Sequence, residues 1–434
     1  MKKSIKLTLV YVVIAVLLLS TALSFYFIGR NSRKKIMVPI DNNVQNIYVT
    51  FGTLPILYSI LHIMTHSEPS YVYFGRVDTF DVTKLPKNAQ LIVPQNVDYN
   101  PSQIVNFTID AIHDIEQKND QPFYNFFVDD LRVLLPFRAF FANNIPKSRF
   151  SITLLSDGSA SYSGIFDPIV GPNGESSFIQ NGQKLQDILQ AFEQNNSGEN
   201  SVTDGEILES YLYAYQAAQF SNVEYWMQYP EFAFLSDDVL TSVKTELLTA
   251  TLVKKQPLDI LNKLSKYRRE AFFDGTLNNS KSFSKDDFDK IFLQSEKPVM
   301  LISGTHIGNG KNPENFDDAV DAVIDSFGQD YNIMLKPHPA QNIHDAQFDK
   351  TREKGITILP AQLPMEVLMW AYPDLSIGGY QSTLYMATLQ SQVAFFFESF
   401  EQGGFPSGGI TLRHMKLLYE YGFFSSAKML TAKQ

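Results

Sequence analysis

Residues 356–397 decide the fold, and they read ITILPAQLPMEVLMWAYPDLSIGGYQSTLYMATLQSQVAFFF. Short apolar runs alternate here with segments of helical pattern. We expect strands at Ile356–Leu359, Asp374–Ile377 and Val393–Phe397, with helices at Pro364–Ala371 and Gln381–Leu389. This alternation predicts a parallel sheet that is covered by helices on both faces.

The same pattern extends toward the N-terminus. It predicts strands at Val299–Ser303 and Tyr331–Leu335 and helices at Phe316–Phe327 and Asn342–Glu353. In the first half we expect strands at Asn46–Phe51, Tyr71–Phe74, Gln90–Val93, Phe123–Val128 and Phe150–Leu155, helices at Thr53–Met64 and Ser102–Gln117, a loop at Gln194–Asp204 and a long helix from Glu206. The predicted fold class is therefore α/β, with two Rossmann-like domains that face a cleft.

The N-terminal segment has a different character. Leu7 to Ile28 carry no charge over about 22 residues, enough for a helix that spans a bilayer. Basic residues stand on both sides of this run, so they do not orient it in the membrane. We expect residues 1–35 to be an uncleaved single-pass anchor. A cleaved signal peptide is the alternative, since Ala22-Leu23-Ser24 resembles a cleavage site.

The domain boundaries follow from these two patterns. We place a tether at 36–45 after the anchor, the first Rossmann-like domain at 46–220, the second at 221–400, and at 401–434 a closing segment, which we expect to be a helix that crosses back to the first domain.

Composition excludes several kinds of site. The chain of 434 residues has no Cys, so it has no disulfide, zinc-thiolate site or cysteine nucleophile. Its net charge is −10, and the basic residues of the anchor make the remainder more acidic still. A body of this charge has no general attraction for nucleic acid, so an anionic substrate would need local hydrogen-bond donors.

Polar motifs follow three predicted strands of the second half. Lys336-Pro337-His338-Pro339 holds an imidazole between two prolines, although a lone histidine is more often structural. Gly378 to Thr383 is a strand–glycine–helix junction that suits a phosphate, or a tight turn with Ser382 as the N-cap. Glu366 begins a helix, where it suits either the helix dipole or a ribose diol.

The first half offers carboxylates at strand ends. Asp157, in Ser156-Asp157-Gly158-Ser159, suits a general base or a turn, and Asp129-Asp130 lies at the end of another strand. We predict no metal site, because the histidines form no metal-binding pair. The Asp287-Phe288-Asp289 motif lies in a charged helical stretch, where a solvated face is the simpler interpretation.

Taken in order, these motifs resemble the bacterial sialyltransferases of glycosyltransferase family 80, the Pasteurella and Photobacterium type. The order is Asp-Gly-Ser, Ser-Gly-Thr, Lys-x-His-Pro, Pro-x-Glu-Val-Leu-Met and Gly-Gly-x-x-Ser-x-Leu-Tyr. Arg413–Ala427 is similar to a closing helix that crosses back to the first domain. The resemblance covers nearly the whole chain after residue 45. It implies a GT-B fold and an inverting transfer from CMP-sialic acid to a galactoside of a surface glycan, with no metal and no further cofactor.

The resemblance also assigns residue roles. Asp157 matches the general base and His338 the general acid. The residues matched to the CMP side are Gly304, Thr305, Lys336, Pro339, Glu366, Ser382 and Thr383, and those on the acceptor side are Asp129 and Ser159. The acceptor side departs from the family pattern. Asp129 stands where the family has a histidine, and His306-Ile307 replaces a tryptophan.

The alternatives are a transferase of the same fold that uses CMP-Kdo or another nonulosonate, and a non-catalytic anchored glycan-binding protein. The expected partners are a nucleotide sugar, a glycan acceptor and the bacterial inner membrane, with no nucleic acid. CMP-sugars are made in the cytoplasm, which favours a catalytic body on that side.

Overall fold

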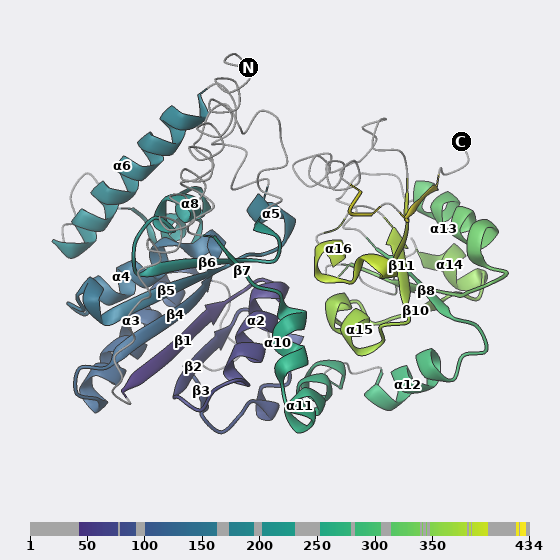
Figure 1. Ribbon diagram of the computed structural model, residues 1–434, viewed down its shortest axis with the longest axis horizontal. Helices are drawn as coiled ribbons and strands as arrows, with labels where there is room; N and C mark the ends of the chain where they lie inside the picture. Colours follow the sequence, from purple (N-terminus) through teal and green to yellow (C-terminus); the bar gives the residue numbers. More distant parts are fainter. Residues whose placement is uncertain are drawn as a thin grey trace, which may run out of the picture.

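The structure, a computed structural model, describes most of the chain after residue 42. The described residues are 43–76, 79–92, 100–162, 173–194, 202–230, 252–278, 283–304, 314–338, 341, 344, 348–379, 382, 384–397, 422–424 and 426–430. They form two α/β lobes, drawn in purple to teal and in green to yellow in Figure 1.

The first lobe is built on a seven-stranded sheet in the order β3-β2-β1-β4-β5-β6-β7, in which every neighbouring pair is parallel. Its strands are β1 (Val44–Thr50), β2 (Ser70–Phe74), β3 (Ala89–Leu91), β4 (Phe123–Asp129), β5 (Phe150–Leu155), β6 (Val223–Met227) and β7 (Leu252–Lys254). The central strands are buried on both faces, because parallel strands need crossover helices that cover the sheet.

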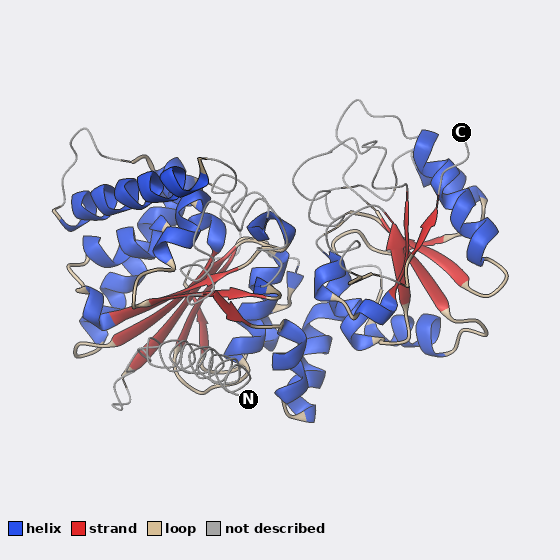
Figure 2. Ribbon diagram, turned by 45° about the horizontal axis from the view of Figure 1, so that its top comes forward, coloured by secondary structure: helices blue, strands red, loops and turns tan. Residues whose placement is uncertain are grey.

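Nine helices of the described residues accompany this sheet. They are α2 (Thr53–Ile63), α3 (Pro101–Lys118), α4 (Leu134–Ala142), α5 (Ser159–Tyr162), α6 (Gly174–Glu193), α7 (Asp204–Leu208), α8 (Ala214–Ala217), α10 (Pro257–Lys263) and α11 (Lys266–Leu277). The last two lead to the second lobe, and Figure 2 shows the helices on both sides of the red strands.

The second lobe has a six-stranded parallel sheet in the order β10-β9-β8-β11-β12-β13. Its strands are β8 (Val299–Ser303), β9 (Asn332–Lys336), β10 (Thr357–Ile358), β11 (Ser376–Gly379), β12 (Val393–Phe397) and β13 (Lys428–Leu430), and its helices are α12 (Lys285–Leu293), α13 (Glu314–Phe327), α14 (Asp349–Glu353), α15 (Met365–Ala371) and α16 (Leu384–Ala387). Phe272 in α11 and Trp370 in α15 stack with their ring centroids 6.4 Å apart. The main apolar core therefore continues from one lobe into the other.

The predicted fold class of two parallel α/β sheets is confirmed, and the predicted strands agree with the observed ones to within about two residues at each end. The predicted boundary at residue 220 does not match the sheets. Strands β6 and β7 follow that residue and still pair into the first sheet, so this sheet extends to Lys254.

The long helix expected from Glu206 is wrong. Helix α7 ends at Leu208, because Ser210 takes part in hydrogen bonds with another segment. Its backbone N–H donates to the Leu131 carbonyl at 2.9 Å, and its hydroxyl accepts from the Leu134 amide at 2.9 Å. These two hydrogen bonds take the place of bonds that would continue α7. The long helix of this region is α6, which the sequence analysis did not predict and which ends just before the predicted loop Gln194–Asp204.

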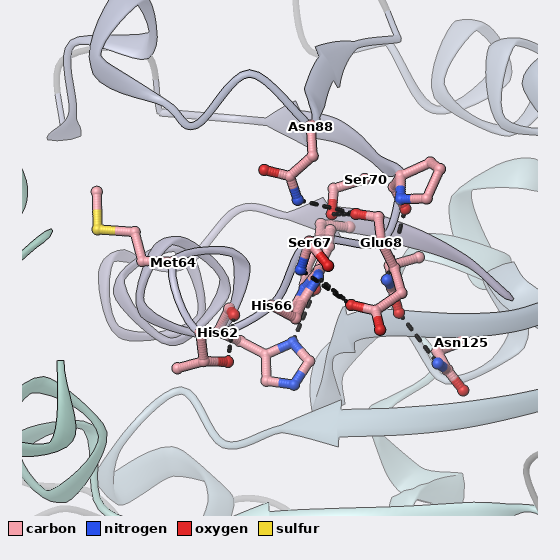
Figure 3. Close-up of polar contacts among 12 residues, drawn as sticks. His62, Met64, His66, Ser67, Glu68, Ser70, Asn88 and Asn125 are labelled. Atoms are coloured by element: carbon pink, nitrogen blue, oxygen red, sulfur yellow. Dashed lines mark hydrogen bonds and ion pairs between the residues drawn. The ribbon is translucent and has the colours of Figure 1, made fainter. Parts of the chain in front are cut away.

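A polar cluster connects the end of α2, and the segment that follows it, to Tyr48 of β1, and Figure 3 labels its members His62, His66 and Glu68. The Tyr48 hydroxyl lies 2.7 Å from His62 Nδ1 and 3.0 Å from His66 Nε2. His66 Nδ1 in turn lies 3.1 Å from Glu68 Oε2. Burial lowers the pKa of His62 to about 3, so this imidazole is neutral in the folded protein.

The two chain ends are described only in part. The predicted anchor, 1–35, and tether, 36–45, lie outside the described residues except for 43–45. Among the helices that are described, none is long and apolar enough to cross a membrane. Of the predicted closing segment, residues 401–421 also lie outside the described part. Lys428–Leu430 is a strand rather than a helix, because it pairs with β12 and forms the edge of the second sheet.

Candidate active site

A cavity of about 630 Å³ lies between the two lobes, at the carboxyl ends of strands from both sheets. Ligands bind at this edge in parallel α/β sheets. The first lobe contributes Thr53, Leu54, Gly75, Arg76, Thr79 and Asp157, and the second contributes Ser303, Gly304, Lys336, Pro337, His338, Gln362, Leu363, Pro364, Met365, Glu366, Ser382, Leu384 and Ala387. Six residues predicted from the sequence therefore meet around one cavity: Asp157, Gly304, Lys336, His338, Glu366 and Ser382.

For four further predicted site residues, the position relative to the cavity is not described. Thr305, Pro339 and Thr383 lie outside the described residues. Ser159 is the first residue of α5, and its side chain is not described.

Asp157 follows β5 and faces the cavity from the first lobe. Gly158, directly after it, has φ of +84°, a left-handed conformation that turns the chain into α5. Burial raises the pKa of the Asp157 carboxyl well above its usual value. The nearby charges of Asp129 and Asp130 add to this rise, whereas Arg76 and Arg132 oppose it. A carboxyl group in this environment is a suitable proton acceptor near neutral pH.

The loop between β1 and α2 is fixed by Asp129, which is fully buried. The backbone amides of Phe51 and Gly52 donate to its two carboxylate oxygens, each at 2.8 Å. Both oxygens are therefore occupied below the loop, and Asp129 does not line the cavity. Asp129 therefore holds this loop in position, and its predicted place on the acceptor side stays a prediction.

Lys336 and Glu366 lie in the wall of the second lobe, and each influences the pKa of the other through its charge. The Lys336 ammonium is buried and donates to the Ala361 carbonyl at 2.8 Å. Burial lowers the pKa of this amine to about 8, although the charge of Glu366 acts in the opposite direction. Burial raises the pKa of Glu366, and Lys336 and Arg76 counteract this effect. The Lys336 ammonium can donate hydrogen bonds to a ligand in the cavity, and the Glu366 carboxylate can accept hydrogen bonds from hydroxyl groups of the same ligand.

Two loops of the second lobe hold His338 in place. The His338 amide donates to Gln341 Oε1 at 2.8 Å, and the Gln341 amide donates back to the His338 carbonyl at 2.9 Å. The Gly304 amide donates to the Lys336 carbonyl at 2.8 Å. A Cβ at Gly304 would lie 2.9 Å from the His338 nitrogen, so only glycine allows the two loops to approach this closely.

The glycine pair near Ser382 is part of strand β11 rather than of a turn. A Cβ at Gly378 would lie 2.3 Å from the Phe395 ring, and one at Gly379 would lie 2.6 Å from Ser303. Gly379 also has φ of +146°. Ser382 lines the cavity and accepts a hydrogen bond from the Leu384 amide at 3.3 Å, so the residue also caps α16.

No group of three or more histidine and carboxylate side chains among the described residues could hold a metal ion. Asp287 and Asp289 have other partners. Asp287 forms a capping box with Ser284 at the start of α12, and Asp289 bonds to Lys285 and to the Tyr372 hydroxyl. The two residues lie on a helix, as expected, but both are half-buried and hydrogen-bonded rather than on a solvated face.

Sequence reasoning missed Arg76, an exposed cation at the rim of the cavity. Its Nη1 donates to the Thr53 hydroxyl at 2.8 Å, and its charge lowers the pKa values of both Asp157 and Glu366. Arg76 therefore acts on both walls of the cavity. Its place two residues after the predicted strand Tyr71–Phe74 is the signal that could have identified it.

No family model and no curated protein matches the chain. Solved structures do match. An α/β-galactoside α2,3-sialyltransferase from Photobacterium phosphoreum has a TM-score of 0.66 and 16% identity, over 90% of this chain and 99% of its own. The GT-B domain of a sialyltransferase from Photobacterium damselae has a TM-score of 0.63 and 17% identity, over 90% of this chain and 100% of its own.

A third structure, a 2,6-sialyltransferase from another Photobacterium, was solved with the donor product CMP and the acceptor substrate lactose. It has a TM-score of 0.65 and 17% identity, over 89% of this chain and 78% of its own. These likenesses span both lobes, whereas the identities are low. The chain therefore has the GT-B fold of the bacterial sialyltransferases that its sequence motifs resemble.

Proposed function

We propose that the protein is an inverting sialyltransferase that moves sialic acid from CMP-sialic acid to a galactoside of a surface glycan, in an α2,3 or α2,6 linkage. One observation carries the proposal. Asp157 on one sheet and His338 on the other line the same cavity, together with Lys336, Glu366 and Ser382. The structural likeness to sialyltransferases, one of them with CMP and lactose, supports the choice of substrates.

In the proposed reaction, the acceptor hydroxyl attacks the anomeric carbon of sialic acid from the side of the first lobe. Asp157 takes the proton of that hydroxyl as general base. The bond from the anomeric carbon to the phosphate oxygen of CMP breaks on the opposite side, where His338 donates a proton or a hydrogen bond to the leaving oxygen. Placement of the two groups on separate walls fits a direct displacement, which inverts the anomeric configuration.

The remaining residues of the second lobe would bind the nucleotide. We assign the ribose hydroxyls to Glu366 and the phosphate to Ser382 and the loop after it. Lys336 and Gly304 belong to the same wall, and the Lys336 ammonium adds a positive charge next to Glu366. The residues so assigned require neither a metal ion nor another cofactor.

Thermal unfolding in the presence of CMP, CDP or UDP tests the nucleotide assignment. A ligand at 100 times its dissociation constant stabilises the folded state by about 2.7 kcal/mol, so CMP should raise the melting temperature more than UDP does. Transfer assays with CMP-sialic acid and CMP-Kdo on lactose then identify the sugar. Equal shifts with CMP and UDP, or no product with CMP-sialic acid, contradict the proposal.

We also propose that residues 1–35 anchor the catalytic body to the bacterial inner membrane, on the strength of the uncharged run Leu7–Ile28. Fractionation of cells that express the full chain and a chain without residues 1–35 tests this. The full chain should remain with the membranes after a high-salt wash, and the truncated chain should be soluble and active. A truncated chain that still fractionates with membranes contradicts the anchor.

A further inference from the structure

A second carboxylate, Asp130, lies behind Asp157 and does not line the cavity. It is fully buried, and two hydroxyl groups donate to its Oδ2 atom: the Tyr225 hydroxyl at 2.6 Å and the Ser161 hydroxyl in a short hydrogen bond. Asp130 Oδ1 has no hydrogen-bond partner within the described part of the chain. Burial of a carboxylate lowers the stability of the folded state unless hydrogen bonds compensate for it. The two hydroxyl donors at Asp130 therefore suggest a functional role for this residue in addition to packing.

Ser161 links Asp130 to the proposed base. The Ser161 oxygen accepts a hydrogen bond from the Asp157 backbone amide at 3.0 Å. Because the Ser161 proton goes to Asp130, the lone pairs of the serine oxygen face the amide. Ser161 is itself fully buried, and its carbonyl accepts from the Tyr215 hydroxyl at 2.9 Å. The direction of every bond in the chain Asp157–Ser161–Asp130 is thus set by the carboxylate at its end.

The charge of Asp130 also reaches Asp157. The charged and titratable groups around the two carboxylates are Asp129, Arg132, Arg76, Tyr225 and Tyr215. Burial raises the pKa of Asp130 to about 7. Above that pH the carboxyl is ionised, and its negative charge contributes to the raised pKa of Asp157.

We propose that Asp130 is a positioning residue for the general base: through Ser161 it fixes the backbone of Asp157, and its charge makes the Asp157 carboxylate a better proton acceptor. The inference rests on the proposed function, since it assigns a partner to the base of that reaction. Asp130 touches neither substrate, and it acts only through Ser161 and through its charge.

Two variants separate the two effects. Ser161→Ala removes the bridge and keeps every charge, so kcat for transfer from CMP-sialic acid to lactose should fall about 3- to 10-fold, the value of one hydrogen bond. Ser161→Thr, which keeps the hydroxyl, should restore part of the rate. Asp130→Asn removes the charge as well. It should lower kcat and also move the acidic limb of the kcat–pH profile to lower pH, because the pKa of Asp157 falls.

A matched control distinguishes positioning from stability. Ser151→Ala removes a buried hydroxyl at the other end of β5, where Ser151 donates to Asn125 Oδ1 at 2.7 Å. Within the described part of the chain Ser151 has no contact with Asp130 or Asp157, so this variant should lower the melting temperature about as much as Ser161→Ala does and keep the wild-type kcat and pH profile.

The outcomes are distinct. An active wild type whose Ser161→Ala and Asp130→Asn variants keep its kcat and its pH profile overturns this inference and leaves the proposed function standing. A wild type that binds CMP but transfers no sialic acid contradicts the proposed function, and the inference falls with it. CMP will not stabilise the Asp130→Asn variant if that variant fails to fold. In that case the comparison of Ser161→Ala with Ser161→Thr tests the inference.

Discussion

Gly52 and Asp157 lie in direct contact, although they come from different strand ends of the first sheet. A Cβ placed on Gly52 would fall 2.1 Å from Asp157 Oδ1. The Gly52 amide is at the same time held by Asp129 Oδ1 at 2.8 Å, so the loop cannot retreat. The space in which the Asp157 carboxylate stands therefore exists only because residue 52 has no side chain.

This contact predicts the effect of Gly52→Ala. The added methyl group should push the Asp157 carboxylate out of position and lower kcat for transfer by about 10²-fold or more, since that is the lower range for a positioned general base. Binding of CMP, measured by its thermal shift, should be unchanged. Gly182→Ala in α6 is the matched control, because the nearest atom to its Cβ is 3.9 Å away. A Gly52→Ala protein with normal kcat would show that the base lies elsewhere.

Asp157→Asn and His338→Ala should affect different parts of the reaction. Asp157→Asn should lower transfer to lactose by about 10²–10⁴-fold while CMP binds as in the wild type. His338→Ala should slow both transfer and hydrolysis of the donor by water, because both need the same leaving group. CMP release, followed with and without lactose, measures the two reactions. Normal donor hydrolysis in His338→Ala would contradict the role of this residue as general acid.

Arg76→Ala should change the pH dependence of the reaction. Arg76 lowers the pKa of Asp157, so its removal raises that pKa. The acidic limb of the kcat–pH profile should then move to higher pH, opposite to the shift expected for Asp130→Asn. Arg76→Lys keeps the charge and should keep the profile, although it loses the present bond to Thr53. If the acidic limb of the kcat–pH profile is unchanged in Arg76→Ala, the charge of Arg76 does not influence the pKa of Asp157.

The histidine cluster predicts a loss of stability in mild acid. The pKa of His62 is about 3 in the folded protein and about 6.5 in an unfolded chain, so the unfolded state binds an extra proton between these values. Stability therefore falls as pH decreases below 6.5, by about 2 kcal/mol between pH 6.5 and 5.

Urea unfolding at the two pH values, for wild type and His62→Gln, measures this contribution. The glutamine variant should be less stable at pH 7 and should lose less on acidification. His113→Gln, at an exposed position of α3, serves as the control and should behave like the wild type. If His62→Gln lost as much stability as the wild type on acidification, another group would be responsible.

The second sheet and its site could be predicted from the sequence because the signals are local. Each strand there except β13 is an apolar run, and the residues that line the cavity lie at the strand ends, as Lys336 ends β9 and His338 follows it. The first lobe depends more on contacts between distant segments. Nothing near Asp129 indicates that its oxygens bind the amides of Phe51 and Gly52, 78 and 77 residues earlier. The end of α7 is equally non-local, since Ser210 bonds to Leu131 and Leu134.

The two walls of the cavity belong to different sheets, each with its own hydrogen bonds. Substitutions at the strand ends of the first lobe can therefore leave intact the loops that Gly304, Lys336 and Gln341 hold together in the second. If the protein acts as we propose, with the acceptor on the first lobe and the activated donor on the second, natural selection can change which sugar is modified while the donor stays the same. Under that proposal, lineages with this architecture should diversify in their acceptors faster than in their nucleotides.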